Sequence, residues 1–397
     1  MGKKHLRSGR FVRQSGNHQA FIPADLPPNP PLEFREDTLC LLNDAGLALG
    51  RLDGLTVNLP NPNMFLSMYV RKEALLSSQI EGTQASLDDI LAYEAEKLER
   101  GDRHDTVEVI NYIRAMNYGL ERLEKLPICL RLIREIHETL LQGVLGQGKN
   151  PGDFRTSQNW IGSPGSTINT ASFVPPPPHE MQNSLNSLER FIHKGKNLPS
   201  LIRCALIHAQ FETIHPFLDG NGRIGRLLIT LILYQEQVLH QPLLYLSYYF
   251  KANRQGYYDR LNAIRHDGAW EEWIDFFLKG VAEVADQATQ TARRILKLRS
   301  EHEQIVQNAR PRGARNALLL LDALYETPYM TPTMVCERLQ VSQPTANGLL
   351  SVFRKHDLVR EITGQRWRQV FGYEPYLALL REGTEPPQED VDRAQSE

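Results

Sequence analysis

The sequence has few of the features that mark secreted, membrane-spanning or nucleic-acid-coating proteins. It contains four cysteines in 397 residues, and their scattered positions match neither metal-binding nor redox spacings, so we expect reduced thiols. No run approaches the roughly 18 apolar residues of a membrane-spanning helix. The formal net charge is only −2, which argues against bulk attraction to nucleic acid or to a membrane surface.

The first ten residues are basic, but no apolar segment follows them, so we expect no secretory signal. Leu6 stands where N-myristoylation requires Ser or Thr. Apolar residues make up 41% of the chain and charged residues 23%, which are values of ordinary globular proteins. The length allows two or three domains. The sequence therefore predicts a soluble, cytoplasmic protein without a membrane partner.

One run of the chain is unusually rich in chemical groups. It reads HPFLDGNGRIGR from His215 to Arg226, and the apolar residues 227–234 that follow predict a buried helix. We expect Arg223 and Arg226 in the first turn of that helix. A glycine-bearing loop entering a helix binds anions, because free backbone N–H groups and the positive end of the helix dipole point to one place. Two guanidiniums match phosphate oxygens, so the run predicts a polyphosphate site.

Two other side chains of the run suit chemistry on a polyphosphate. Asp219 offers a hard oxygen ligand of the kind that Mg²⁺ prefers. His215 is the only evident proton acceptor in the run, and an imidazole titrates near neutral pH. A helix-capping loop without chemistry would not explain two arginines beside these two groups.

Two known patterns compete for the same residues. Residues 220–225 fit the G-x-G-x-x-G pattern of dinucleotide-binding folds, but that pattern needs a preceding strand, and residues 201–213 have the apolar spacing of a helix. His208, Glu212 and His215 have the spacing of metal ligands on one helix face. Since the following proline disfavours a helical conformation at His215, we expect that face to break before its third ligand.

The run resembles the signature of the Fic family, H-P-F-x-[D/E]-G-N-G-R-x-x-R, and it matches at every fixed position. Fic proteins typically transfer AMP from ATP to a hydroxyl side chain of a target protein and release pyrophosphate, a reaction called adenylylation or AMPylation. The resemblance implies an all-α Fic core with a short flap. It also implies ATP as substrate, Mg²⁺ as cofactor, and target proteins, the chain itself included, modified on Ser, Thr or Tyr. A phosphorylating variant of the family carries Lys where this chain has Gly222, so the glycine favours nucleotidyl transfer.

The resemblance also assigns roles to single residues. His215 would deprotonate the target hydroxyl, Asp219 would hold Mg²⁺, and Asn221 with the backbone of its two neighbouring glycines would line the anion hole for the α-phosphate. Arg223 and Arg226 would bind the β- and γ-phosphates. The residues expected around ATP are Glu81, His215, Gly220, Asn221, Gly222, Arg223, Ile224, Gly225, Arg226 and Tyr258. Tyr258 comes from a Tyr-Tyr-x-x-Leu segment that resembles a pocket-lining helix of related chains; core packing of either tyrosine stays open.

A second Fic pattern lies upstream. Residues 71–80 predict a helix on which Ser77 and Glu81 share a face, and Gly82 follows at the expected C-cap. From spacing alone Glu81 is an ordinary surface glutamate. Ser77, Glu81 and Gly82 nevertheless fit the inhibitory motif [S/T]-x-x-x-E-[G/N] of Fic proteins in which the inhibitory helix precedes the core. The resemblance implies that Glu81 pairs with Arg226 and keeps the γ-phosphate from docking productively.

Four regions follow from these patterns. We expect an N-terminal Fic-associated region with the inhibitory helix (1–100), a catalytic core (101–300), a winged helix-turn-helix domain (305–382) and a disordered tail (383–397). Residues 1–36 predict mostly extended chain. Helices are expected at 37–53, 62–98, 103–126, 128–143, 180–196, 200–214, 223–237 and 255–297. The proline-rich loop 152–178 corresponds to the family's flap, which registers the target segment by β-augmentation; a rigid proline spacer is the alternative.

The C-terminal domain leaves its partner open. Three helices and a two-stranded wing around residues 363–365 predict the winged helix, and a thin basic stripe including Arg354, Lys355, Arg366 and Arg368 fits DNA. Dimerisation or docking of another protein is the competing interpretation. Three alternatives to adenylylation also remain: removal of AMP from proteins, transfer of another nucleotide such as UMP, and a transcriptional regulator that senses nucleotide.

Overall fold

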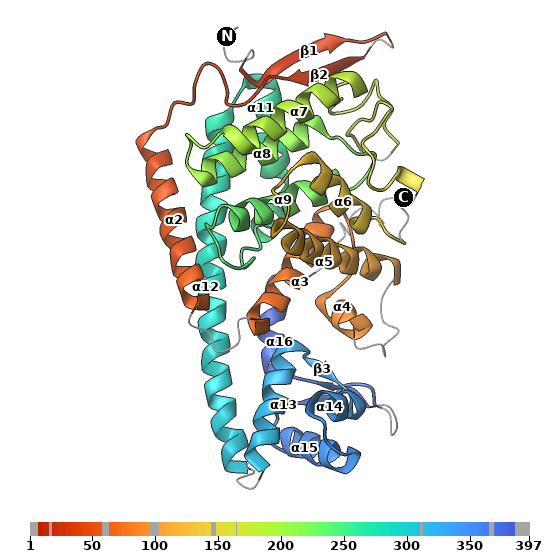
Figure 1. Ribbon diagram of the computed structural model, residues 1–397, viewed down its shortest axis with the longest axis vertical. Coiled ribbons are helices and arrows are strands. Elements are labelled where there is room, and N and C mark those ends of the chain that lie inside the picture. The colour runs from red at the N-terminus through yellow and green to blue at the C-terminus, as the bar shows by residue number, and fades with distance from the viewer. Residues whose placement is uncertain are drawn as a thin grey trace, which may run out of the picture. The chain divides into compact units, whose positions relative to one another are not determined.

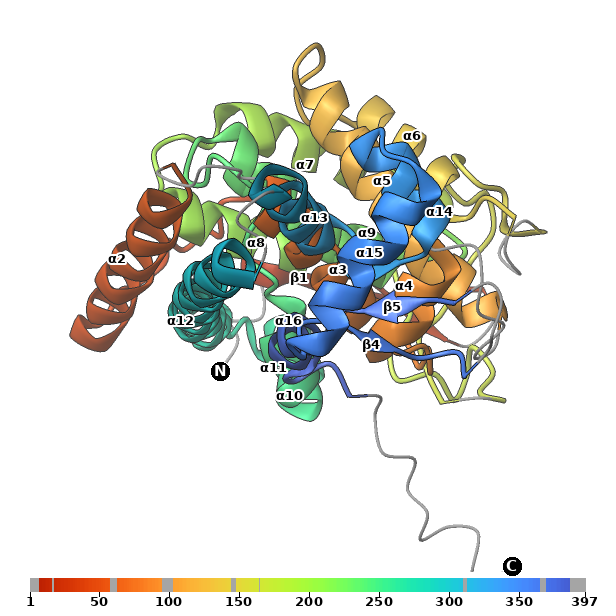
Figure 2. The same ribbon diagram turned by 90° about the horizontal axis from the view of Figure 1, so that it is seen from below.

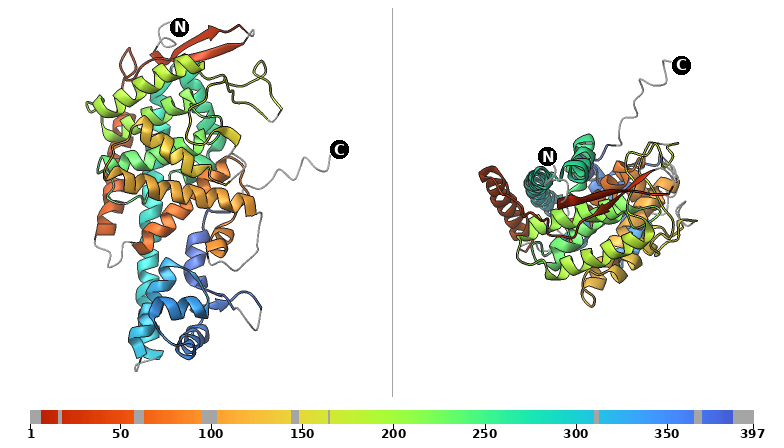
Figure 3. Two further views of the ribbon diagram at one scale, coloured as in Figure 1. Left: turned by 45° about the vertical axis from the view of Figure 1, so that its right-hand side comes forward. Right: turned by 90° about the horizontal axis from the view of Figure 1, so that it is seen from above.

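The computed structural model describes residues 7–15, 18–57, 63–94, 103–143, 148–163, 165–309, 313–364 and 369–385. Its contacts divide the chain into two compact units. The first consists of Met1–Asp53 and Asn111–Asp286, and the second of Gly54–Ile110 and Gln287–Glu397. Both units are mostly helical, and each carries one small sheet (Figures 1 and 3). The predicted fold class is therefore confirmed.

The first unit is a set of helices with an N-terminal β-hairpin. The hairpin strands β1 (Gly9–Arg13) and β2 (Gln19–Pro23) pair antiparallel. The helices, three of which (α2, α5 and α12) also have residues in the second unit, are α2 (Glu36–Val57), α5 (Arg103–Leu123), α6 (Leu130–Leu140), α7 (Pro178–Lys194), α8 (Ser200–Ile214), α9 (Asn221–Gln235), α10 (Ser247–Ala252), α11 (Arg254–Asp267) and α12 (Trp270–Ala309).

Helices α8 and α9 form the centre of the first unit. Every residue of α8 from Leu201 to Ile214 is buried, and so are most residues of α9. A helix that is apolar on all sides is stable only inside a protein. α7 packs on α8, and α6 packs on both α7 and α9 (Figure 1). The connection between α8 and α9, residues 215–220, is therefore held at both ends by buried helices.

The hairpin covers part of this helical core. For residues 1–36, which include the hairpin, the sequence predicted mostly extended chain. Strand β2 packs on α7 and α8. Phe21 is fully buried, and its ring lies 6.2 Å from that of Phe173, measured between centroids. The backbone N–H of Phe21 donates to the carbonyl of Val174 at 2.9 Å. The hairpin thus fastens the second half of the 152–178 loop to the core.

The second unit combines N-terminal helices with the C-terminal domain. Its sheet has the strand order β3-β5-β4, with both pairs antiparallel. Apart from the parts of α2, α5 and α12 that it shares, its elements are α3 (Asn63–Ile80), α4 (Leu87–Glu94), α13 (Ala314–Glu326), β3 (Tyr329–Met330), α14 (Pro332–Leu339), α15 (Gln343–Lys355), β4 (Arg360–Glu361), β5 (Phe371–Gly372) and α16 (Glu374–Arg381).

Helices α13, α14 and α15 followed by the small sheet match the expected winged helix-turn-helix (Figure 2). The sheet has three strands where the sequence predicted two, because residues before α14 add β3. Thr331 caps α14, since its hydroxyl accepts the N–H of Met334 at 3.2 Å. On α15 the basic residues Arg354 and Lys355 are exposed. The wing residues Arg366 and Arg368 and the tail after residue 385 lie outside the described residues.

Two stretches expected to be helical each contain two helices separated at a glycine, and of these two breaks only the one at Gly82 was expected. In the stretch 62–98, α3 ends at Ile80 and Gly82 has a φ of +108° before α4 begins. In the stretch 255–297, Gly268 has a φ of +65° and ends α11. Glycine adopts these left-handed conformations without a side-chain clash, which makes it a common helix terminator.

Within the described ranges, no helix is both long and apolar enough to span a lipid bilayer. All four cysteines are free thiols, in agreement with their scattered positions in the sequence.

Candidate functional site

His215 ends α8 in a left-handed backbone conformation. Its φ and ψ are 49° and 62°, and its N–H donates to the carbonyl of Phe211 at 2.9 Å. The helix stops before His215, as expected from Pro216. A left-handed conformation costs a non-glycine residue about 1–2 kcal/mol, so neighbouring groups must hold it in place.

Two side chains of the flap, residues 152–178, bond the backbone of His215. Arg155 Nε donates to the His215 carbonyl at 2.9 Å, and Asn159 Nδ2 donates to the same oxygen at 3.3 Å. The Arg155 guanidinium also donates to the carbonyls of Ser157 and Pro176, at 3.1 and 2.6 Å. Burial lowers the pKa of Arg155 to about 10, so the group is still a cation at neutral pH. One buried cation therefore ties both ends of the flap to His215.

Asn221 holds the other end of the connection. Its side-chain oxygen accepts the N–H of Phe217 at 2.8 Å, and its side-chain nitrogen donates to the carbonyl of Phe217 at 2.9 Å. This amide was predicted to line the anion hole. The structure gives it a further task, which is to fix the shape of the loop, and its contact with a phosphate stays a prediction.

Asp219 presents a carboxylate at the beginning of α9. One of its oxygens, Oδ1, accepts the N–H of Gly220 at 2.6 Å and lies 3.6 Å from the Arg223 guanidinium. The Asp219 side chain is 45% exposed, whereas that of Arg223 is 6% exposed. Mg²⁺ commonly binds one or two carboxylates and completes its shell with water and phosphate oxygens. A single, accessible carboxylate beside the N-terminus of α9 fits such an ion.

The two arginines of the run are both buried in α9. Because α9 already begins at Asn221, Arg223 falls in its first turn and Arg226 in its second. The expectation that both lie in the first turn was wrong, since the helix starts two residues earlier than predicted. Both side chains still start from the end of α9 at which the helix dipole is positive.

Four more residues of the predicted ATP site contribute backbone and packing. Gly220 has a φ of +75° at the N-cap of α9, and Gly222 brings no side chain to the helix N-terminus. Ile224 is fully buried, so its side chain faces the core. A Cβ atom added to Gly225 would lie 2.4 Å from Glu212 Oε1, so a side chain there requires the Glu212 carboxylate to move.

His137 of α6 joins the flap to the loop, and sequence reasoning missed it. Its ring stacks on Phe217 at 3.7 Å between centroids. The N–H of Gly152 donates to His137 Nδ1, and Nε2 lies 3.0 Å from the carbonyl oxygen of Asp219. Nε2 therefore carries the proton and donates. Burial lowers the pKa of His137 to about 4, which keeps the ring neutral. Its only sequence signal was a place among the apolar residues of a helix.

The flap is a loop with a single short pairing. Ile161 and Phe173 form an antiparallel bridge, with N–H···O distances of 2.8 and 3.1 Å. The Phe173 ring lies under the buried guanidinium of Arg265, 3.8 Å from Arg265 Cζ to the ring centroid. The two halves of the flap are thus paired at residues 161 and 173. Binding of a target segment at its edge stays a prediction.

His208, the first residue of the alternative metal face, belongs to the core. Its Nδ1 lies 2.9 Å from the carbonyl oxygen of Gly225 and its Nε2 lies 2.9 Å from the Tyr257 hydroxyl. Burial lowers the pKa of His208 to about 3. In the part of the chain that the structure describes, no group of three His, Cys, Asp or Glu side chains could hold a metal. Tyr257 is buried beside His208, which leaves Tyr258, partly exposed under Arg254, as the tyrosine able to face a ligand.

The upstream motif lies at the end of α3 in the second unit. Ser77 is buried inside the helix, while Glu81 is the first residue after it and is exposed. The N–H groups of Glu81 and Gly82 donate to Ser78 and Gln79 at 3.0 and 3.2 Å. Glu81 therefore lies in a turn and not on the helix face with Ser77, because the helix ends at the residue before it. The Glu81–Arg226 pair joins residues of different units and stays a prediction.

Comparison with known proteins agrees with this geometry. Residues 39–121 match the family described as Fic/DOC family N-terminal, and residues 127–233 match the family described as Fic/DOC family. The chain is a Fic/DOC family protein. The first match includes Ser77, Glu81 and Gly82, and the second includes the whole 215–226 run of this Fic protein. Tyr258 and the C-terminal domain lie outside both matches.

Relatives of this Fic protein carry adenylyltransferase names. A probable protein adenylyltransferase of Aquifex aeolicus is 30% identical over 182 residues, which are 44% of this chain and 51% of that protein. The protein adenylyltransferase Fic of Drosophila grimshawi is 26% identical over 205 residues, 51% of this chain and 38% of that protein. The chain thus spans about half the length of these relatives, or less. A Fic family protein from Desulfovibrio desulfuricans has the same fold, with a TM-score of 0.55 at 19% identity over 86% of this chain and 97% of that one.

Proposed function

We propose that this Fic/DOC family protein is a protein adenylyltransferase that transfers AMP from ATP to Ser, Thr or Tyr hydroxyls of target proteins, its own included. The observation that carries the proposal is the connection between α8 and α9. It places His215 at one end, and Asp219 with the buried Arg223 at the other. A base, a carboxylate and guanidiniums at a helix N-terminus suit attack on a phosphate better than any other chemistry of these groups.

The chain's own residues would act on the two reacting ends of ATP. His215 accepts the proton of the target hydroxyl as the hydroxyl oxygen attacks the α-phosphorus. An oxygen–phosphorus bond forms to the target, and the bond from the α-phosphorus to the oxygen bridging to the β-phosphate breaks. Pyrophosphate leaves, and the proton remains on the imidazole. Arg223 and Arg226 compensate the charge of the leaving group, and Mg²⁺ held by Asp219 would supply further charge compensation when bound.

The choice of AMP over phosphate transfer is supported by Gly222. The resemblance to the family associates a lysine at this place with phosphorylation of the target. A lysine there would place a cation at the N-terminus of α9, whereas the glycine keeps that surface to backbone N–H groups. The adenylyltransferase names of the relatives point the same way.

We further propose that Glu81 restrains this activity by binding Arg226 in place of the γ-phosphate. Two observations support this. The motif Ser77–Gly82 falls within the segment matching the Fic/DOC N-terminal family, and Glu81 is an exposed residue of the turn that follows α3. Binding of DNA, or of a second copy of the chain, by the C-terminal domain remains a prediction from the sequence.

The test uses ATP labelled on either the α- or the γ-phosphate, with Mg²⁺, the Glu81→Gly variant and a cell lysate as source of targets. We expect label from the α-phosphate on the protein itself and on targets, and none from the γ-phosphate. The double variant Glu81→Gly/His215→Ala serves as the matched control and should incorporate almost none. Label from the γ-phosphate would mean phosphorylation, and no protein label from either would contradict a transferase. Competition by unlabelled UTP would identify a different base preference.

A further inference from the structure

The C-terminal domain packs against the helix that carries the Ser77–Glu81 motif. Helix α13 lies beside α3 within the second unit. Helix α16 belongs to the same body, because Tyr373 and Tyr376 are fully buried and their rings lie 5.2 and 4.7 Å from that of Tyr325 in α13. A displacement of the C-terminal domain therefore carries α16 with it.

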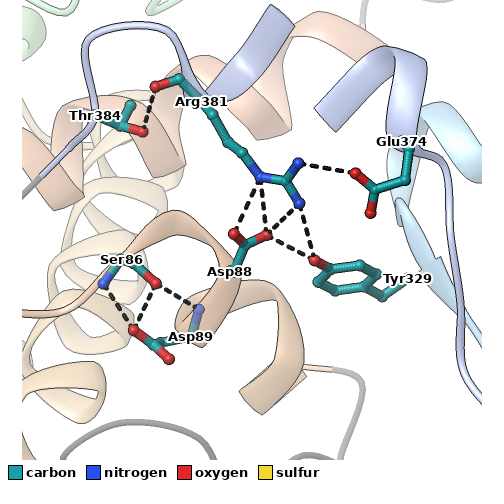
Figure 4. A network of polar contacts seen from close by, with 7 residues as sticks. All are labelled: Ser86, Asp88, Asp89, Tyr329, Glu374, Arg381 and Thr384. Atoms are coloured by element: carbon teal, nitrogen blue, oxygen red, sulfur yellow. Dashed lines mark hydrogen bonds and ion pairs between the residues drawn. The ribbon is translucent and has the colours of Figure 1, made fainter. Parts of the chain in front are cut away.

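Arg381, the last residue of α16, forms an ion pair with Asp88 in the first turn of α4 (Figure 4). Arg381 Nε and Nη2 donate to the two carboxylate oxygens of Asp88 at 3.0 and 2.9 Å. The other terminal nitrogen, Nη1, donates to Glu374 at 2.9 Å. The hydroxyl of Tyr329 in β3 donates to Asp88 at 2.6 Å. A two-pronged guanidinium–carboxylate pair fixes orientation as well as distance, so α4 is held by two separate parts of the C-terminal domain.

The residues that follow Arg381 in the chain contact α3. Residues 381–384, called the C-terminal strap, are bonded by two buried side chains of that helix. Lys72 Nζ donates to the carbonyl of Glu382 at 2.7 Å, and Gln79 Nε2 donates to the carbonyl of Thr384 at 3.2 Å. These two contacts lie on either side of Ser77 in sequence. The strap therefore contacts α3 through the segment that carries the motif.

Glu81 lies in the turn between the two helices that the C-terminal domain holds. Gln79 closes the turn by donating to the carbonyl of Ala85 at 3.0 Å as well. The far end is fixed by reciprocal bonds between Ser86 and Asp89, with Ser86 Oγ accepting the Asp89 N–H at 3.2 Å and an Asp89 carboxylate oxygen accepting the Ser86 N–H at 2.9 Å (Figure 4). Since Gly82 within the turn has a glycine's backbone freedom, the conformation of Glu81 depends on how these ends are held.

We propose that Arg381 is a positioning residue for Glu81: through Asp88 it holds the α3–α4 turn in the conformation in which Glu81 restrains AMP transfer. The C-terminal domain is thereby coupled to the active site, and a partner that displaced α16 would release the restraint. This inference rests on the proposed adenylylation and its inhibition by Glu81.

The test is a double-mutant cycle on the full-length chain, read as incorporation of α-labelled AMP. Arg381→Ala should raise the initial rate about fivefold or more over wild type, the lower range of typical coupling between sites. In the Glu81→Gly background the same change should alter the rate by less than about twofold, because the restraint is already absent. A change that merely damaged the fold would lower the rate in both backgrounds.

Three further variants make the cycle specific. Arg338→Ala is the matched control, since Arg338 forms its ion pair with Glu326 of α13, and it should leave the rate unchanged. Asp88→Asn keeps the size of the side chain and should reproduce the gain of Arg381→Ala, which also covers the case in which Arg381→Ala fails to fold. The exchange of both charges, Asp88→Arg with Arg381→Asp, should restore part of the restraint.

The outcomes distinguish the proposed coupling through Arg381 and Asp88 from the proposed inhibition by Glu81. If Glu81→Gly is activated but Arg381→Ala and Asp88→Asn label at the wild-type rate, the coupling is wrong and the inhibitory role of Glu81 stands. Equal gains from Arg381→Ala with and without Glu81 would also overturn the coupling. If Glu81→Gly itself shows no gain over wild type, the autoinhibition is wrong, and this inference is overturned with it.

Discussion

The buried guanidinium of Arg155 donates a 2.9 Å hydrogen bond to the carbonyl oxygen of His215, a residue 60 positions away. The same guanidinium reaches the flap carbonyl of Pro176. His215 has a left-handed backbone, which it would not keep without such partners. The orientation of the imidazole therefore depends on the flap as well as on α8.

Replacing Arg155 by lysine should slow AMP transfer because the ammonium group cannot reproduce the planar fork of donors. We expect kcat to fall about tenfold or more with little change in KM for ATP, since misplacement of a reacting group lowers the rate of the chemical step. Carbonyl groups left without a partner should also reduce the free energy of unfolding by about 1–3 kcal/mol. Initial rates and urea unfolding measure the two effects, and an unchanged kcat would contradict the positioning role.

Replacing His215 by alanine should leave ATP binding largely intact, because the predicted phosphate contacts come from the loop and from α9. Transfer should fall by about 10²-fold or more, the usual effect of losing a general base. Binding of ATP is measured by calorimetry and transfer by incorporation of α-label. A variant that labels targets at the wild-type rate would show that another group takes the proton.

Replacing Asp219 by alanine should weaken Mg²⁺-dependent binding of ATP and abolish transfer. Mg²⁺ would lose its carboxylate ligand, and the negative charge of the phosphates would then be left uncompensated. Asp219→Asn is the matched variant, since it keeps the shape and can still accept the N–H of Gly220. Titration of the rate against Mg²⁺ concentration reports the effect. If both variants need no more Mg²⁺ than wild type, Asp219 is not the ligand.

Replacing Glu81 by glycine should raise adenylylation at least about tenfold, since each 1.4 kcal/mol of a competing ion pair changes occupancy of the productive pose tenfold. The fold should tolerate the change because Glu81 is exposed in a turn. Arg226→Ala should not give this gain, since it removes the phosphate contact together with the partner of Glu81. The measurement compares α-label incorporation at equal protein concentration. Equal labelling by wild type and Glu81→Gly would make Glu81 an ordinary surface residue.

Stability should fall in mild acid because of His137. Burial lowers its pKa from 6.5 to about 4, so between these values the unfolded chain takes up a proton that the folded chain refuses. The stabilisation is complete above about pH 6.5 and is lost as the pH falls towards 4. From about pH 7.5 to about pH 5, this one group should lower the free energy of unfolding by about 2 kcal/mol.

Urea unfolding of wild type and His137→Gln at the two pH values isolates this contribution. His208, whose pKa is lowered to about 3 by burial, acts in the same direction in both proteins and cancels in the comparison. The variant should lose less stability on acidification by about the amount assigned to His137. Identical losses would show that His137 is not neutral in the folded chain.

The sequence indicated the residues that could do chemistry, because the 215–226 run keeps them adjacent in the chain. It could not indicate His137 or Arg155, since their partners are distant: His137 meets the carbonyl of Asp219, 82 positions away. A histidine among apolar helix residues and an arginine in a proline-rich loop look alike whether they bond solvent or a buried carbonyl. Only the packing of α6 and the flap on the loop distinguishes the two cases.

The positions at which helices end were also only partly predictable from the sequence. Apolar periodicity runs through residues 62–98 and 255–297, so the pattern alone continued a helix through each; the C-cap expected at Gly82 marked one break, and the break at Gly268 was not predicted. A glycine inside an apolar pattern is tolerated in many helices. Whether it terminates one depends on the contacts that follow, such as the bond from Gln79 to Ala85 that closes the α3–α4 turn.

Gly225 occupies a position that the Fic signature leaves free, yet in this chain a Cβ there would lie 2.4 Å from Glu212 Oε1, so a side chain fits only if the Glu212 carboxylate moves. The two positions should consequently change together during evolution. Relatives with a larger residue in place of Gly225 should carry a shorter one in place of Glu212, so that α8 and α9 keep the same separation. A motif position that is variable across a family can thus be invariant within one lineage, and the neighbouring helix decides which.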